Sequence, residues 1–112
     1  MIQYEIFSLD ESIKLHGVDW QNILISNNDA PSLLPQWIKC TSEVFNKKIE
    51  VFVATNEKTV IGIIPFYIDI VSKFGLKIKI ISLAGNLVSY HQSFIIQESF
   101  SEQVLNIWFE FL

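Results

Sequence analysis

The sequence predicts a mixed α/β domain of the α+β kind, in which a mostly antiparallel mixed sheet is flanked by helices in the order β-α-α-β-β-β-β-α. Three observations indicate this order. Apolar residues recur at helical spacing early in the chain and again at its end. Between residues 49 and 83 the pattern changes to strands, several of which alternate every two residues. The turns between these strands are short and polar, which suits antiparallel hairpins.

The front of the chain is predicted to hold one strand and two helices. Residues 2–8 alternate as an opening strand does. Asp19 is a candidate cap for a helix that begins at Trp20 and ends in the polar run at residues 26–29. Pro35 suits the first turn of a second helix, where a missing N–H costs nothing. The apolar face expected on this second helix consists of Leu34, Trp37, Ile38, Thr41, Val44 and Phe45.

The middle of the chain is predicted to be a meander of strands. Residues 49–55 form its first strand, and residues 59–70 form a long return strand. Gly62 and Pro65 mark a bulge or an exposed edge in that return strand. Residues 76–83 alternate lysine with isoleucine, which is typical of one solvated face and one buried face.

The last part of the chain is predicted to be a short buried strand at residues 93–96 and a helix that starts near Ser101. Trp108, Phe109 and Phe111 surround this helix too fully for one buried face. We therefore expect contact with a second lobe or subunit, with simple core packing as the alternative. The helix has no glycine, basic last turn or proline stop, so residues 1–112 are expected to be one lobe truncated in or just after it.

Composition excludes several classes of protein. The chain is 50% hydrophobic and 18% charged, with a net charge of −4 and no arginine, so nucleic-acid binding is not expected. The single cysteine, Cys40, cannot form an internal disulfide and is expected to be buried and inert. No signal peptide is recognisable, and the longest apolar stretch, residues 60–71, is too short to span a membrane. We therefore predict a cytoplasmic protein with no membrane span.

The predicted order of elements resembles the opening of the GNAT acyltransferase fold. Three stretches carry the resemblance. Residues 19–45 place a tryptophan on each of two helices around a proline-containing turn, residues 51–67 form a hairpin ending in Gly-Ile-Ile-Pro-Phe, and residues 73–96 supply the next strand, loop and short strand. Together they are similar to the first lobe of the FemAB-like, CelD/BcsL-type acetyltransferases, which are built from two GNAT-like halves.

The sequence departs from that family at two places. An Asp-Tyr-x-Asp pattern is frequent in the loop after the third meander strand, and residues 89–92 here read Ser-Tyr-His-Gln. The glycine-rich pyrophosphate loop of GNAT proteins should precede the last helix, and residues 97–101 contain no glycine. Glu98 would also repel phosphate groups there. The resemblance therefore implies that acetyl-CoA binds the parent enzyme through its second half, and not this lobe alone.

Tyr90 and His91 are the candidate catalytic residues. His91 suits a general base toward an amine at neutral pH, and the Tyr90 hydroxyl can donate a proton or orient a substrate. The alternative is a surface histidine and a tyrosine packed at the sheet edge. Ser89, Gln92 and Trp37 are candidate substrate contacts, and Trp37 as part of the core is the alternative for that residue.

Other reactive side chains give no site. His16, beside Gly17, is expected to be a solvated turn residue between the first strand and the first helix. The sequence shows no metal-ligand spacing, glycine-rich phosphate loop or Ser-His-Asp arrangement, so no metal is expected.

The resemblance implies the N-terminal lobe of an acyl-CoA-dependent N-acyltransferase. Such an enzyme transfers an acetyl group to a small amine acceptor, for example an amino sugar or a cell-envelope precursor. The lobe would form one wall of the acceptor cleft, contact a C-terminal catalytic lobe or a second copy through its last helix, and be inactive alone. The alternatives are a non-catalytic GNAT-like interaction or dimerisation module, and a small ligand-binding α/β domain.

Overall fold

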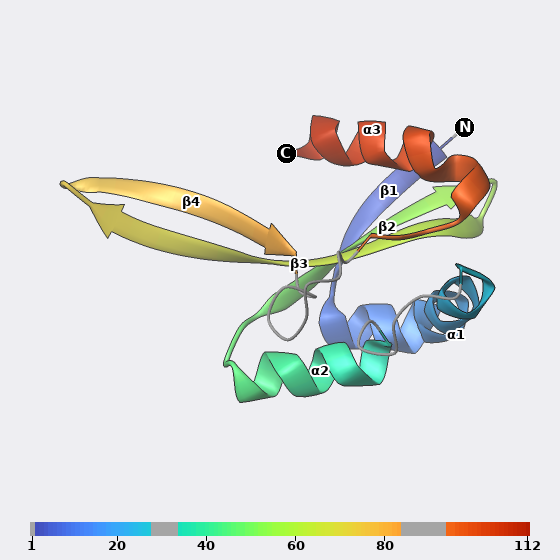
Figure 1. Cartoon of the computed structure of the whole chain (residues 1–112), viewed down its shortest axis with the longest axis horizontal. Helices are drawn as coiled ribbons and strands as arrows, with labels where there is room; N and C mark the ends of the chain where they lie inside the picture. The colour runs from blue at the N-terminus through green and yellow to red at the C-terminus, as the bar shows by residue number, and fades with distance from the viewer. Residues whose placement is uncertain (1, 28–33, 84–93) are drawn as a thin grey trace.

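The computed structural model describes residues 2–27, 34–83 and 94–112. It confirms the α+β class and the predicted order of strands and helices (Figure 1). The elements are β1 (Ile2–Ser8), α1 (Leu9–Asn27), α2 (Pro35–Val44), β2 (Ile49–Asn56), β3 (Thr59–Lys73), β4 (Leu76–Leu83), β5 (Ile95–Ile96), the 3-10 helix η3 (Glu98–Phe100) and α3 (Ser101–Phe111).

All strand pairs in the sheet are antiparallel, and the long strand β3 organises them. The order is β1-β2-β3-β4, with β5 also paired to β3. Strand β2 pairs with residues 59–67 of β3, while β5 pairs with residues 62–63 and β4 with residues 66–73. Because β2 occupies one edge of β3, both β4 and β5 lie along the other edge. They are therefore two parts of one strand position, separated in the chain by residues 84–94.

Helices cover both faces of the central strands (Figure 1). On the face of α1 and α2, a cluster that includes Trp20, Ile38 and Ile63 is buried. On the face of α3, a second cluster includes Phe52 and Trp108. Large apolar side chains fully buried in this way stabilise a fold by roughly 1.5–3 kcal/mol each. The two clusters make the central part of the sheet, with its three helices, the stable body of the protein.

Helix α1 begins earlier than the sequence analysis predicts. It starts directly after β1 and not at Trp20, because Ser8 caps it: the Glu11 N–H donates to Ser8 Oγ at 3.3 Å. Ser-x-x-Glu is a known helix-start signal. The prediction that His16 lies in a turn is therefore wrong. His16 lies within α1, half-buried, with its ring 5.4 Å from the ring of Phe7.

Helix α2 buries a narrower stripe than predicted. Pro35, Ile38 and Thr41 are buried, whereas the side chain of Trp37 is 57% exposed. The prediction of a buried Cys40 is wrong, because this thiol is exposed. Each residue turns a helix by about 100°, so Cys40, two positions after Ile38, lies on the opposite side from the sheet.

Gly62 and Pro65 have separate roles in β3. The pairing with β2 shifts register beside Gly62, which confirms the predicted bulge. A Cβ on Gly62 would lie 2.8 Å from Val104 Cγ1, so the glycine lets α3 approach the sheet closely. Pro65 is buried and lies between the segments of β3 that pair with β5 and β4, where a proline removes no ladder bond from that edge.

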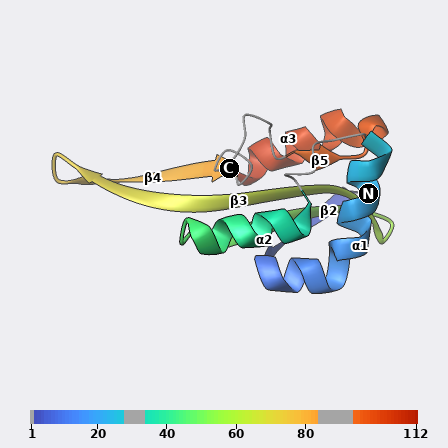
Figure 2. The same cartoon turned by 60° about the horizontal axis from the view of Figure 1, so that its bottom comes forward.

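Beyond Tyr67, strands β3 and β4 leave the body as a two-stranded ribbon, here called the arm (residues 68–81). Figures 1 and 2 show that it extends past all three helices. The predicted burial of one face of residues 76–83 is wrong for this chain. Ile78 is 47% exposed and Ile80 is 44% exposed, because none of the described helices lies over the arm.

The aromatic residues of α3 divide between the core and the surface. Trp108 is buried, and its ring lies 5.3 Å from that of Phe52 and 5.6 Å from that of Phe111. Phe109 and Leu112 are exposed. Core packing therefore accounts for two of the three aromatic residues, and Phe109 lies on the exposed side of α3.

Candidate functional site

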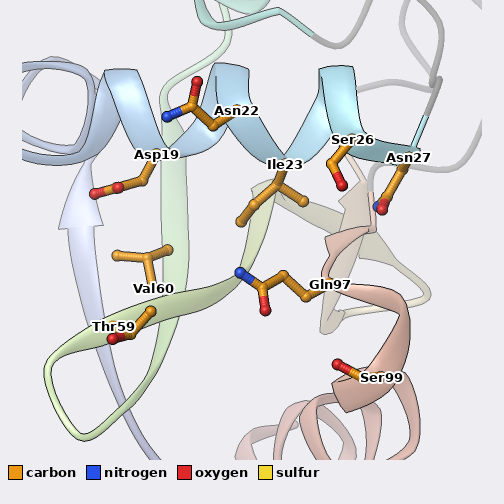
Figure 3. Close-up of a pocket in the computed structure, with 9 residues that line it drawn as sticks. All are labelled: Asp19, Asn22, Ile23, Ser26, Asn27, Thr59, Val60, Gln97 and Ser99. Carbon is orange, nitrogen blue, oxygen red and sulfur yellow. The ribbon is translucent and has the colours of Figure 1, made fainter.

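An open pocket of 740 Å³ lies where α1, the start of β3 and the segment after β5 meet (Figure 3). Asp19, Ile23 and Ser26 point from α1 toward Val60 and Gln97. The complete lining is Asp19, Asn22, Ile23, Ser26, Asn27, Thr59, Val60, Gln97 and Ser99. Most of these side chains are polar, so a ligand in this pocket would be contacted mainly by hydrogen-bonding groups.

The fold positions the pocket residues through local spacing and two hydrogen bonds. Asp19, Asn22 and Ser26 follow at three- and four-residue steps, so they share one face of α1. Ile23, between them, is buried and holds that face against the sheet. The end of α1 is held to β5 because Asn27 Nδ2 donates to the carbonyl oxygen of Ile96 at 2.6 Å.

The segment after β5 is fixed in the same way. The N–H of Gln97 donates to the carbonyl oxygen of Ile61 at 2.8 Å, which extends the β5 pairing by one residue. The N–H of Phe100 then donates to the carbonyl oxygen of Gln97 at 2.9 Å and closes η3. The side chains of Gln97 and Ser99 are thereby held at the pocket wall opposite α1 (Figure 3).

Among the described residues that line the pocket, only Asp19 is charged, and it is acidic. Asp19 Oδ2 lies 3.9 Å from His16 Nδ1, and the aspartate side chain is 52% exposed. No lysine is among the lining residues, and the other polar groups are neutral amides and hydroxyls. Such a lining favours a neutral or cationic polar ligand, and it disfavours a phosphate group, which is recognised by cationic side chains.

A second, smaller pocket of 290 Å³ lies between the start of α1 and the end of α2. Two of its three lysines have acidic partners: Lys39 Nζ lies 3.2 Å from Asp10 Oδ1, and Lys47 Nζ lies 2.9 Å from Asp69 Oδ1. Lys47 also lies 5.4 Å from the centre of the Tyr67 ring. This pocket is therefore mainly a structural junction between β1, α2 and the base of the arm.

Of the predicted site residues, the structure describes only Trp37. Trp37 is exposed on α2 and lines neither pocket. Ser89, Tyr90, His91 and Gln92 lie outside the described residues. The pocket residues Asn22, Asn27 and Gln97 were missed by sequence reasoning. The polar spacing of Asp19, Asn22 and Ser26 was the available signal for one wall, but nothing in the sequence links that wall to Gln97.

Among residues 2–27, 34–83 and 94–112, no three His, Cys, Asp or Glu side chains gather as metal ligands would. None of the helices in that part of the chain has the length and apolar character needed to cross a bilayer.

Comparison of the chain with known protein families, with curated proteins and with solved structures finds no significant match. The resemblance to GNAT-type acetyltransferases thus rests on the order of elements and the quoted stretches of sequence.

Proposed function

We propose that this chain is the acceptor-binding lobe of a GNAT-type N-acyltransferase, and that the pocket beside Asp19 holds the amine acceptor. The parent reaction would transfer an acetyl group from acetyl-CoA to an amine, such as that of an amino sugar. The catalytic half and the acetyl-CoA site would lie in a second lobe, and the reaction would take place in the cytoplasm.

The observation that carries the proposal is the chemistry of the 740 Å³ pocket. An amino sugar combines a cationic amine with several hydroxyl groups. Asp19 supplies the matching negative charge, and Asn22, Thr59 and Gln97 supply neutral donors and acceptors. The pocket also lies beside the junction between β5 and α3, where proteins of the resembled fold hold the pyrophosphate of CoA. An acidic, lysine-free lining at that position supports a lobe that binds acceptor and not cofactor.

Titration of the isotope-labelled chain with glucosamine, glucose and acetyl-CoA, followed by amide chemical shifts, tests this proposal. We expect glucosamine to shift Asp19, Asn22, Gln97 and Ser99, glucose to shift them more weakly, and acetyl-CoA to leave them unchanged. Asp19→Asn should weaken glucosamine binding by up to about fivefold, since half-exposed ion pairs contribute about 1 kcal/mol at most. Glu110→Gln, an exposed acid on α3, is the matched control. Equal binding of glucose and glucosamine, or binding of acetyl-CoA to these residues, would contradict the proposal.

A non-catalytic interaction module is the second candidate function. The outer face of α3 favours it, because Phe109 and Leu112 are 65% and 56% exposed there. In that case a second copy would dock on α3. Light scattering on a concentration series distinguishes the two functions: dimerisation lost in Phe109→Ser, without any effect of glucosamine, would favour the module.

A further inference from the structure

The arm is the most exposed apolar feature among the described residues. Its two strands pair with each other from Ile68–Ile81 to Lys73–Leu76, and β2 stops pairing with β3 at Tyr67. Two-stranded ribbons in water are marginal without further strands or a covering helix. We therefore expect an arm of this kind to be covered, either by a lipid phase or by a partner protein.

Apolar side chains lie on both faces of the arm. Alternation along the strands places Ile68, Ile70 and Ile81 on one face, and Val71, Ile78 and Ile80 on the other. Each of these residues is at least 36% exposed. A docked protein surface would cover one face and leave the other wet, whereas a lipid phase surrounds an inserted tip on all sides.

The tip of the arm carries the most exposed aromatic residue of the described part of the chain. Phe74 and Gly75 are the central residues of the turn, with φ of 54° and 76°, and Phe74 is 93% exposed. Turns with positive φ at both positions favour Asn-Gly, so a bulky residue at the first position is strained. Leu76, the next residue, is 67% exposed. A strained phenylalanine presented to solvent indicates selection for contact at the tip.

Charge is segregated between the arm and the rest of the chain. The arm contains three lysines and one acid, Asp69, whose carboxylate pairs with Lys47 outside the arm, whereas the whole chain has eight lysines and twelve acids. Lys73 and Lys77 flank the apolar tip directly, and Lys73 Nζ lies 6.0 Å from the centre of the Phe74 ring. Lysines beside an apolar tip match the phosphates above the acyl chains of an anionic bilayer.

We propose that the arm is a membrane-docking finger, in which Phe74 and Leu76 enter an anionic lipid surface and Lys73, Lys77 and Lys79 contact its headgroups. The lysines stop insertion at the tip, so the open strand edges stay among the headgroups, where their backbone groups find hydrogen-bond partners. This inference is independent of the acceptor pocket, whose lining includes no residue of the arm.

Vesicle binding by the full chain tests the proposal, with sedimentation of mixed phosphatidylglycerol and phosphatidylcholine vesicles against pure phosphatidylcholine. We expect binding to the mixed vesicles alone, weakened by salt. Phe74→Asn should reduce binding about tenfold or more, because it removes the inserted ring while asparagine suits the turn. Lys77→Gln should reduce it about fivefold, the share of one lysine near an anionic surface.

The fluorescence of two tryptophan variants tests whether the contact lies at the tip. Phe74→Trp should shift its emission to the blue on anionic vesicles, after subtraction of the wild-type signal. Glu57→Trp, at the same position of the other hairpin turn, should not shift. Absence of vesicle binding, equal binding to neutral vesicles, or a Glu57→Trp shift as large as that of Phe74→Trp would overturn the proposal. A dimer that is lost in Phe74→Asn, with no vesicle binding, would instead assign the arm to a second copy.

Discussion

The two halves of strand β3 show how much of this fold depends on what covers a strand. Residues 60–66 are buried, because β2, β5 and helices on both faces surround them. Residues 70–73 are exposed, although Ile70 and Val71 are as apolar as the side chains of the buried half. The same strand is therefore core in one half and surface in the other. The covering elements, and not hydrophobicity, decide which half stabilises the protein.

Substitution of Trp108, in the buried body, should have the largest effect on the free energy of unfolding. Trp108→Ala removes a buried ring that packs on Phe52 and Phe66, and we expect a loss of about 3–5 kcal/mol in the free energy of unfolding. Urea denaturation measures it. The matched control is Ile78→Ala in the arm, which should change stability by about 0.5 kcal/mol or less. A large loss from Ile78→Ala would show that the arm belongs to the cooperative core.

Gly62→Ala should have the second-largest effect on the free energy of unfolding. The new methyl group would lie 2.8 Å from Val104 Cγ1, so α3 or the strand must move. Overpacking of this kind costs about 1–3 kcal/mol. Thermal unfolding of Gly62→Ala, Val104→Ala and the double variant measures the coupling. We expect the double variant to be more stable than the sum of the single effects, and simple additivity would exclude this contact as the cause.

Loss of the Ser8 cap should have a smaller effect. Ser8→Ala leaves the Glu11 N–H at the start of α1 without its side-chain acceptor, which typically costs about 1 kcal/mol. Chemical denaturation checks the value, and Ser72→Ala in the arm serves as the control because Ser72 is exposed. Equal stability of both variants would mean that the cap contributes nothing.

Phe74→Asn should give the smallest change in the free energy of unfolding, and this change should be stabilising. Asparagine tolerates the positive φ at this turn position, so the strain of the phenylalanine is relieved by up to about 1 kcal/mol. Because the arm lies outside the body, the free energy of global unfolding should rise by less than this. Hydrogen exchange of the arm amides reports the local gain. Slower exchange in β4, with exchange in β2 unchanged, is the expected outcome.

The sequence predicts the order of elements because their periods differ clearly, but it does not predict boundaries set by a single cap. Helix α1 was placed too late because β1 passes straight into it at Ser8, with no loop to mark the change. The lysine-isoleucine alternation of β4 correctly predicts a strand, but not its exposure. It does not report whether any element covers the apolar face.

The pocket was less predictable than the fold for a related reason. Its walls come from three segments that are distant in sequence, and each contributes ordinary polar residues. Asp19 and Gln97 come to line one pocket because β5 pairs with Gly62 and Ile63 through two residues. So short a strand has too little pattern to be paired from sequence, which is why the polar face of α1 was not connected to Gln97.

The divided strand position formed by β4 and β5 has a consequence for variation in chain length. Each part is registered separately against β3, so the pairing on one side of the division does not depend on the other. A change in the number of residues between Leu83 and Phe94 would therefore leave both registers against β3 as they are.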